Sequence, residues 1–306
     1  MNIKKVMAWL WLASAGMAIV LLAVAIVRMV FAQKTDSIEK LGGQLWVDEE
    51  DPSRPVVGLW LAGPEVTDED LPRLSEFPRL KRLQLPSTHV TSAGLACVKQ
   101  LTELEKLDLG ATFVSDAGLE HVRRLTQLRR LVLSDTRITD AGLKNLEDLT
   151  DLQELHLVNT GITDKGLQYL RRLTRLQILL LDSTAVAGTG LQALARMTDL
   201  DVLSLANTPV DDDGLVSVSK LKSLQHLHVN GTHVTDEGLE HIAGLTRLVT
   251  LSLSRTAVSD SGLPRLRSLS HLRHVRLVDS RCTPDGIKEL HRLMPRLAIV
   301  LSERLE

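Results

Sequence analysis

The hydrophobic positions of this chain repeat every 24 residues from Val56 onward. The repeated frame reads Leu-x-x-Leu-x-Leu-x-x-Thr-x-(Val/Ile)-x-Asp-x-Gly-Leu, and nothing interrupts it until one extra residue precedes Leu297. A fixed period in the twenties is typical of a solenoid, in which each unit buries its apolar edge only against its neighbours. The leading residues of the ten predicted units are Val56, Leu80, Leu104, Leu128, Leu152, Leu176, Leu200, Leu224, Leu248 and Leu272.

Each unit carries two hydrophobic spacings in succession. In a central unit, Leu155 and Leu157 alternate with polar residues, which predicts a strand with one buried face. From Leu167 onward the apolar spacing changes to three, as on one face of a short α or 3₁₀ helix, and Thr163-Asp164 supplies the oxygens that cap its start. The strands are predicted to align as a parallel sheet, on the inside of the curve because helices need more lateral room.

A hydroxyl-bearing residue follows every predicted strand from the second unit onward. At the end of an inward-facing strand this side chain should be buried, and buried hydroxyls need partners. We predict a ladder of hydroxyls that bond backbone groups of adjacent units, at about 1 kcal/mol per rung. The column consists of Thr88, Thr112, Thr136, Thr160, Thr184, Thr208, Thr232, Thr256 and Ser280.

A glycine stands early in nine successive predicted helices. Glycine in a helix costs about 1 kcal/mol relative to alanine, so its recurrence needs a reason. We predict that the backbones of adjacent units approach so closely there that a Cβ would collide. The column consists of Gly94, Gly118, Gly142, Gly166, Gly190, Gly214, Gly238, Gly262 and Gly286.

These motifs closely resemble the leucine-rich repeat family over residues 56–301. The segment 139–143, Thr-Asp-Ala-Gly-Leu, is similar to the ribonuclease-inhibitor and F-box branch, although Thr stands where many members carry Asn or Cys after the strand. The resemblance implies an α/β fold: a curved right-handed horseshoe with a parallel sheet on its concave face and short helices on its convex face. It also implies that the inner sheet binds other macromolecules. An F-box-like segment is missing, so a ubiquitin-ligase function is not carried over.

Departures from the frame at both ends predict caps. Residues 44–48 read as a strand, and the turn-rich segment 50–55 would let it form a hairpin onto residues 57–61 and cover the sheet edge. The predicted organisation is an N-terminal membrane anchor at 1–32, a linker and N-terminal cap at 33–55, ten repeats and a C-terminal cap strand at 56–301, and a tail at 302–306.

The segment from Val6 to Val27 contains 22 residues without a charge, enough to span a bilayer as a helix. A cleaved signal peptide is the alternative, since Val30-Phe-Ala32 could serve as a cleavage site. This apolar core is longer than the usual apolar core of a signal peptide, which favours an uncleaved single-pass anchor. Charges are nearly balanced on its two sides, but the early lysines favour an internal N-terminus and an extracytoplasmic repeat domain.

Composition excludes several function classes. The net charge of −2, with both signs interspersed, argues against a nucleic-acid surface. The two cysteines, Cys97 and Cys282, lie about eight units apart and cannot reach disulfide distance. No glycine-rich phosphate loop, Gly-x-Ser-x-Gly elbow or Cys-x-x-Cys occurs. We therefore expect neither enzymatic activity nor a cofactor, and interpret the recurring aspartates as helix caps: Asp116, Asp140, Asp164, Asp212, Asp236 and Asp260.

The two inner-facing positions of each strand vary from unit to unit, as a recognition surface would. An apolar patch at the middle of the arc is flanked by basic residues on one side and histidines on the other, and such rimmed patches often mark interaction sites. The alternative is that valine and isoleucine simply favour strands. The histidines are too dispersed to converge on zinc, so no metal site is expected. The candidate binding residues are Arg82, Lys106, Arg130, Val132, His156, Ile178, Leu180, Val202, His226, His228, His274 and Arg276.

These observations predict a membrane-anchored module that binds a protein or peptide partner on its inner sheet. A second hypothesis is a structural spacer of the envelope without a specific ligand. A third, a hydrolase that uses the histidines, would lose activity in His228→Ala.

Overall fold

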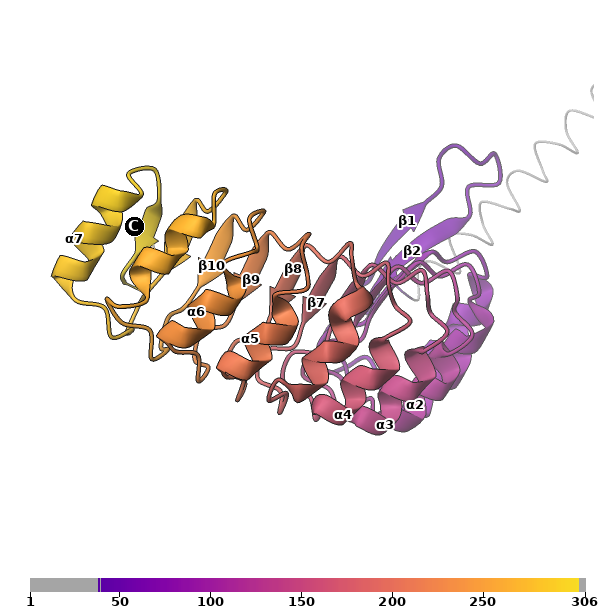
Figure 1. Cartoon of the computed structure of the whole chain (residues 1–306). Coiled ribbons are helices and arrows are strands. Elements are labelled where there is room, and N and C mark those ends of the chain that lie inside the picture. The colour runs from indigo at the N-terminus through magenta and orange to yellow at the C-terminus, as the bar shows by residue number, and fades with distance from the viewer. Residues whose placement is uncertain (1–37, 39, 303–306) are drawn as a thin grey trace, which may run out of the picture.

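The computed structural model describes residue 38 and residues 40–302, and its strands form one 12-stranded sheet in sequence order (Figure 1). The predicted anchor Val6–Val27 lies outside the described residues. Within them, no helix is both long and apolar enough to cross a membrane. The strands are β1 Gln44–Val47, β2 Val56–Trp60, β3 Arg82–Gln84, β4 Lys106–Asp108, β5 Arg130–Val132, β6 Glu154–His156, β7 Ile178–Leu180, β8 Val202–Ser204, β9 His226–His228, β10 Thr250–Ser252, β11 His274–Arg276 and β12 Ala298–Val300.

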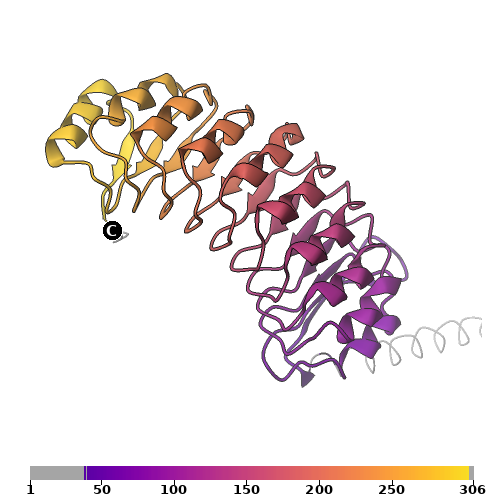
Figure 2. The same ribbon diagram turned by 60° about the horizontal axis from the view of Figure 1, so that its bottom comes forward.

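Short helical segments connect successive strands from β2 to β12 and lie along the outer side of the arc (Figure 2). The predicted solenoid with a parallel sheet and short helices is confirmed. Many of the segments are 3₁₀ or begin as α and end as 3₁₀, in keeping with the three-residue spacing of their leucines. They are η1 Leu71–Glu76, η2 Gly94–Gln100, α2 Asp116–Val122, α3 Asp140–Leu143, η3 Lys144–Leu146, α4 Asp164–Leu167, η4 Gln168–Leu170, η5 Thr189–Arg196, α5 Asp212–Val218, α6 Asp236–Ile242, η6 Leu263–Ser268 and α7 Pro284–Leu293.

The leucines of the frame form one continuous buried column rather than a central sphere. Leu155 of β6 pairs with Leu131 on one side and Leu179 on the other, and all three are 0% exposed. Leu167 and Leu170 close the same layer from the helical side. Because burying a leucine side chain is worth roughly 1.5–3 kcal/mol, each added unit is stabilised mainly by its two neighbours.

The two ends of the sheet are built differently. Strand β1 pairs antiparallel with β2, Gln44 opposite Trp60, which confirms the predicted hairpin. At the other end β12 keeps the 24-residue pairing, with Ile299 opposite Val275, so the extra residue before Leu297 does not shift the strand. Helix α7 is 10 residues long, and Leu297, the buried leucine that follows it, lies 25 residues after the buried Leu272.

The threonine column is buried, but its predicted bonding pattern is wrong. Each hydroxyl donates to the carbonyl oxygen three residues earlier in its own unit, as Thr160 does to Leu157 at 2.6 Å. The cause is local: Asn159 has a φ of 53°, and this turn folds Thr160 back toward the strand that it follows. Adjacent units are joined here by backbone N–H groups instead, such as that of Asn159 bonded to the Asp182 carbonyl at 2.8 Å.

The recurring aspartates join neighbouring units, so their interpretation as caps of their own helices is wrong. The Asp140 carboxylate accepts from the Thr163 N–H at 2.8 Å and from the Thr163 hydroxyl at 2.6 Å. Thr163 alone caps α4, by accepting from the Lys165 N–H at 3.2 Å. We call this set of inter-unit bonds the carboxylate ladder. Its carboxylates belong to Asp68, Asp116, Asp140, Asp164, Asp212, Asp236 and Asp260.

The carboxylate ladder also explains most of the glycine column. A Cβ on Gly166 would lie 2.3 Å from Oδ1 of Asp140, and Gly142, Gly238 and Gly262 show the same conflict with the preceding unit. The predicted close approach is therefore confirmed, but at these positions the neighbour is a carboxylate rather than backbone. Gly190 is different, because a Cβ there would lie 2.5 Å from the backbone carbonyl oxygen of Asp164.

Candidate binding surface

Parallel pairing places the variable inner-facing residues in two straight columns. Arg82 pairs with Lys106, and Lys106 with Arg130, so residues 24 apart in the sequence become neighbours one strand apart. The second column runs two residues further along each strand, from Trp60 and Gln84 to Arg276. All twelve predicted binding residues lie in these columns.

The N-terminal part of the surface is basic. Arg82 and Lys106 are exposed and line a shallow cavity of about 220 Å³ together with Gln84 and Asp108. Arg130, the third predicted cation, forms an ion pair with Glu154, Nη1 to Oε2 at 2.8 Å. That pairing reduces the charge that Arg130 offers to a ligand, so Arg82 and Lys106 carry most of it.

Trp46 is a member of this surface that the sequence analysis did not identify. It stands opposite Gly58 in the hairpin, and a Cβ on Gly58 would lie 2.7 Å from the indole ring. The missing side chain lets Trp46 lie over the sheet, where the Arg82 guanidinium is 5.7 Å from the ring centroid, within cation–π distance. The sequence contained a signal for this position. In the predicted cap strand, alternation places Trp46 on the same face as Gln44 and on the face opposite Val47.

The apolar centre is smaller than predicted. Ile178 and Leu180 of β7 and Val202 of β8 are neighbours and are half-buried, so their side chains remain accessible. Val132 is only 8% exposed, and His156 lies between it and Leu180 in the column. Val132 therefore supports the sheet more than it contributes to the accessible patch.

Histidines occupy the C-terminal part of the surface without converging. His226 and His228 lie on β9, and His274 lies on β11, with Thr250 and Ser252 of β10 between them. In residue 38 and residues 40–302, no group of three His, Cys, Asp or Glu side chains is arranged to hold a metal ion.

Burial lowers the pKa of two histidines of the binding surface, His228 and His156. Burial is the main cause of the lowered pKa of His228; the Asp182 carboxylate acts in the opposite direction, and the neighbouring His226 and Arg276 add to the lowering. Burial likewise lowers the pKa of His156, with Arg130 assisting. Both rings therefore favour the neutral form more than a solvated histidine does.

A polar group beside the centre also escaped the sequence analysis. The Asp182 carboxylate, just after β7, accepts from the Ser204 hydroxyl and from the Ala206 N–H, the latter at 2.7 Å. It thereby connects the units of β7 and β8 at the border of the apolar centre. Asp182 lies two residues beyond Leu180, and the predicted surface included only the two inner-facing positions of each strand.

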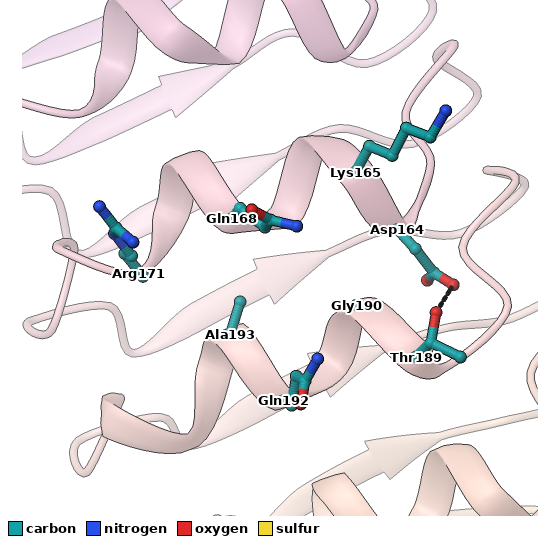
Figure 3. A pocket seen from close by; sticks show the side chains of 8 residues that line it. All are labelled: Asp164, Lys165, Gln168, Arg171, Thr189, Gly190, Gln192 and Ala193. Carbon is teal, nitrogen blue, oxygen red and sulfur yellow. Dashed lines mark hydrogen bonds between the residues drawn. The ribbon is translucent and has the colours of Figure 1, made fainter.

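The convex side has a groove of about 530 Å³ between α4/η4 and η5 (Figure 3). Its acidic residue, Asp164, is committed to the carboxylate ladder through the Thr189 hydroxyl at 2.6 Å. Burial acts to raise the pKa of Asp164, but the hydrogen bonds from Thr189 and from backbone N–H groups outweigh it and hold the pKa below its usual value. The groove therefore offers no free acid, and the concave face remains the better candidate site.

Comparison with protein families supports the repeat assignment. Residues 125–146, 148–170 and 220–243 match the family model described as Leucine Rich repeat. No curated protein sequence matches the chain.

Solved structures share the solenoid fold. An internalin (inlF) from Listeria monocytogenes is 21% identical with a TM-score of 0.60, covering 83% of this chain and 86% of its own. Internalin C2 (inlC2) from the same species is 27% identical with a TM-score of 0.55, covering 69% and 84%. A leucine-rich repeat protein from Leptospira interrogans is 16% identical with a TM-score of 0.54, covering 74% and 68%. Three segments of the chain are therefore similar to the leucine-rich repeat model, and the chain shares its solenoid fold with these solved structures.

Proposed function

We propose that the protein is a non-enzymatic binding module that holds a protein or peptide partner on its concave face. One observation carries the proposal: the frame leucines recur from unit to unit, whereas the inner columns change from strand to strand and place Ile178, Leu180 and Val202 together between a basic zone and a zone of histidines. Accessible apolar clusters with polar rims are typical of interaction sites. The ribonuclease-inhibitor-like form of the repeat, suggested by the Thr-Asp-x-Gly-Leu motif, belongs to the same proposal.

We further propose that Val6–Val27 anchors the module in a membrane, with the repeats on the extracytoplasmic side. The support is the uncharged length of 22 residues and the lysines that precede it. Extraction of membranes at alkaline pH should leave the full chain in the membrane fraction, and protease added outside intact cells should digest the repeats. Release of the chain at alkaline pH would overturn the anchor, and protection of the repeats would overturn the orientation.

Leu180→Asp tests the binding surface directly. A charge in the centre of the apolar cluster should reduce capture of crosslinked partners in intact cells at least about tenfold, because burying an unpaired carboxylate against an apolar ligand is costly. Val216→Asp is the matched control, since Val216 is an exposed apolar residue (42%) on the convex helix α5. Both variants should melt at the wild-type temperature.

Equal partner capture by the two variants would refute the concave binding surface. That result would favour the structural spacer, whose inner face binds nothing specific.

A further inference from the structure

The fixed charge on the concave columns is mostly positive once internal pairing is counted. The Glu154 carboxylate is paired with Arg130 at 2.8 Å, whereas Asp108, which accepts the N–H of Gly110 at 2.9 Å, keeps its charge. The unpaired cations outnumber this single carboxylate. Across the part of the chain that the structure describes, the strand cations that form no ion pair with a carboxylate are Arg82, Lys106 and Arg276.

Lys106 and Arg276 lie equally many strands away on either side of the apolar centre, and Arg82 of β3 lies one strand further out. Lys106 of β4 is three strands from Ile178 of β7, and Arg276 of β11 is three strands from Val202 of β8. Three strand spacings correspond to about 14 Å, which an extended peptide covers in about four residues.

The sheet limits how a ligand can be held. Backbone groups of the central strands are already paired with both neighbours, as Leu155 is with Leu131 and Leu179. A bound segment must therefore cross the strands along the arc and be recognised through side chains. Its charges must complement the cations at the flanks, and its centre must be apolar.

We infer that the concave face binds an acidic peptide segment in which carboxylates lie about four residues to either side of an apolar anchor. The inference rests on the proposed function and specifies the chemistry of its partner. A polyanion such as single-stranded nucleic acid would satisfy Lys106 and Arg82, but it would leave Leu180 and its apolar neighbours without a complementary group.

A random peptide library selected against the full-length chain in phosphatidylcholine nanodiscs tests this. Peptides that bind wild type but not Leu180→Asp are retained, so that only ligands of the apolar centre are scored. We expect Asp and Glu to be enriched three to five positions from an apolar residue. The double reversal Arg82→Glu/Lys106→Glu should weaken a selected peptide at least about tenfold at low salt, because the flanking charges set electrostatic complementarity.

Two control experiments test whether the charge of the concave face, rather than a general loss of positive charge, determines binding. The double reversal Lys165→Glu/Arg171→Glu alters two exposed cations beside the convex groove and should leave peptide affinity unchanged. A peptide with lysine in place of its acids should bind the concave reversal variant better than it binds wild type. Melting curves of both variants should match that of the wild type.

The outcomes separate this inference from the proposed function. Peptides that depend on Leu180 but show no acid enrichment, or that tolerate the concave reversal, overturn the inference and leave the binding module standing. Displacement of the peptides by a single-stranded oligonucleotide at equal concentration also overturns it. A selection without any Leu180-dependent peptide overturns the proposed function itself.

Discussion

Two neighbouring aspartates of the carboxylate ladder, Asp140 and Asp164, bind the following unit through different partners. Asp140 binds the N–H and hydroxyl of one residue, Thr163. In the next unit Ala187 stands at the threonine position, so Asp164 binds the N–H groups of Ala187 and Gly188 and takes its hydroxyl bond from Thr189. The carboxylate keeps its role although its partners have moved by up to two residues.

The next unit departs further from the regular ladder. Gly188 occupies the aspartate position, and Asp211, at the threonine position that follows, bonds the Gly214 N–H of its own unit at 3.2 Å. The strands are unaffected, since Val202 pairs with His226 in the regular register. The sheet therefore holds the concave surface in register, while the edge beside the helices tolerates local variation.

We expect the largest loss of stability where a new Cβ would contact backbone rather than a carboxylate. Gly190→Ala places a Cβ 2.5 Å from the Asp164 carbonyl oxygen, and backbone cannot move aside cheaply, so we expect a loss of about 3 kcal/mol in the free energy of unfolding. Gly166→Ala meets the Asp140 carboxylate, which can rotate, and should cost less. Equilibrium urea unfolding measures both, and a smaller cost at Gly190 would contradict this account.

Removing a ladder carboxylate should have the next largest effect. Asp140→Ala deletes two charge-assisted hydrogen bonds to Thr163 and should cost about 2 kcal/mol in urea unfolding. Asp213→Ala, an exposed acid outside the ladder, is the control and should change stability by less than about 0.5 kcal/mol. In the Asp140→Ala background Gly166→Ala should become less costly, because its clash partner is gone; strictly additive losses would disprove the coupling.

We expect the smallest loss of stability from the threonine column, whose hydroxyl bond is the same in both of the compared units. Thr160→Val and Thr184→Val each remove a hydroxyl bond to a carbonyl of the same unit, at 2.6 Å in both cases. Each should lower unfolding stability by about 1 kcal/mol. The two losses should be equal by thermal or urea unfolding, because the bond does not cross between units. Unequal losses would mean that the threonine column senses the altered ladder.

The positions of the strands could be predicted because alternating leucines repeat at a fixed period, and burial of one face fixes their register. The inner columns follow directly, which is why Arg82, Ile178 and His226 were placed correctly along the sheet. Their role in binding stays a prediction. The accessible extent of Val132 and the pairing of Arg130 with Glu154 could not be read from the pattern, since both depend on what the adjacent strand presents.

The sequence by itself determined the period, the alignment of the strands and the face on which each side chain lies, because hydrophobic burial depends on area and repeats with the frame. Only the tertiary structure decided which polar groups meet. Hydrogen bonds depend on distances within a few tenths of an ångström, and these are set by contacts between units. Asp140 therefore binds the following unit rather than capping its own helix, and Trp46 reaches Arg82 only because Gly58 has no side chain.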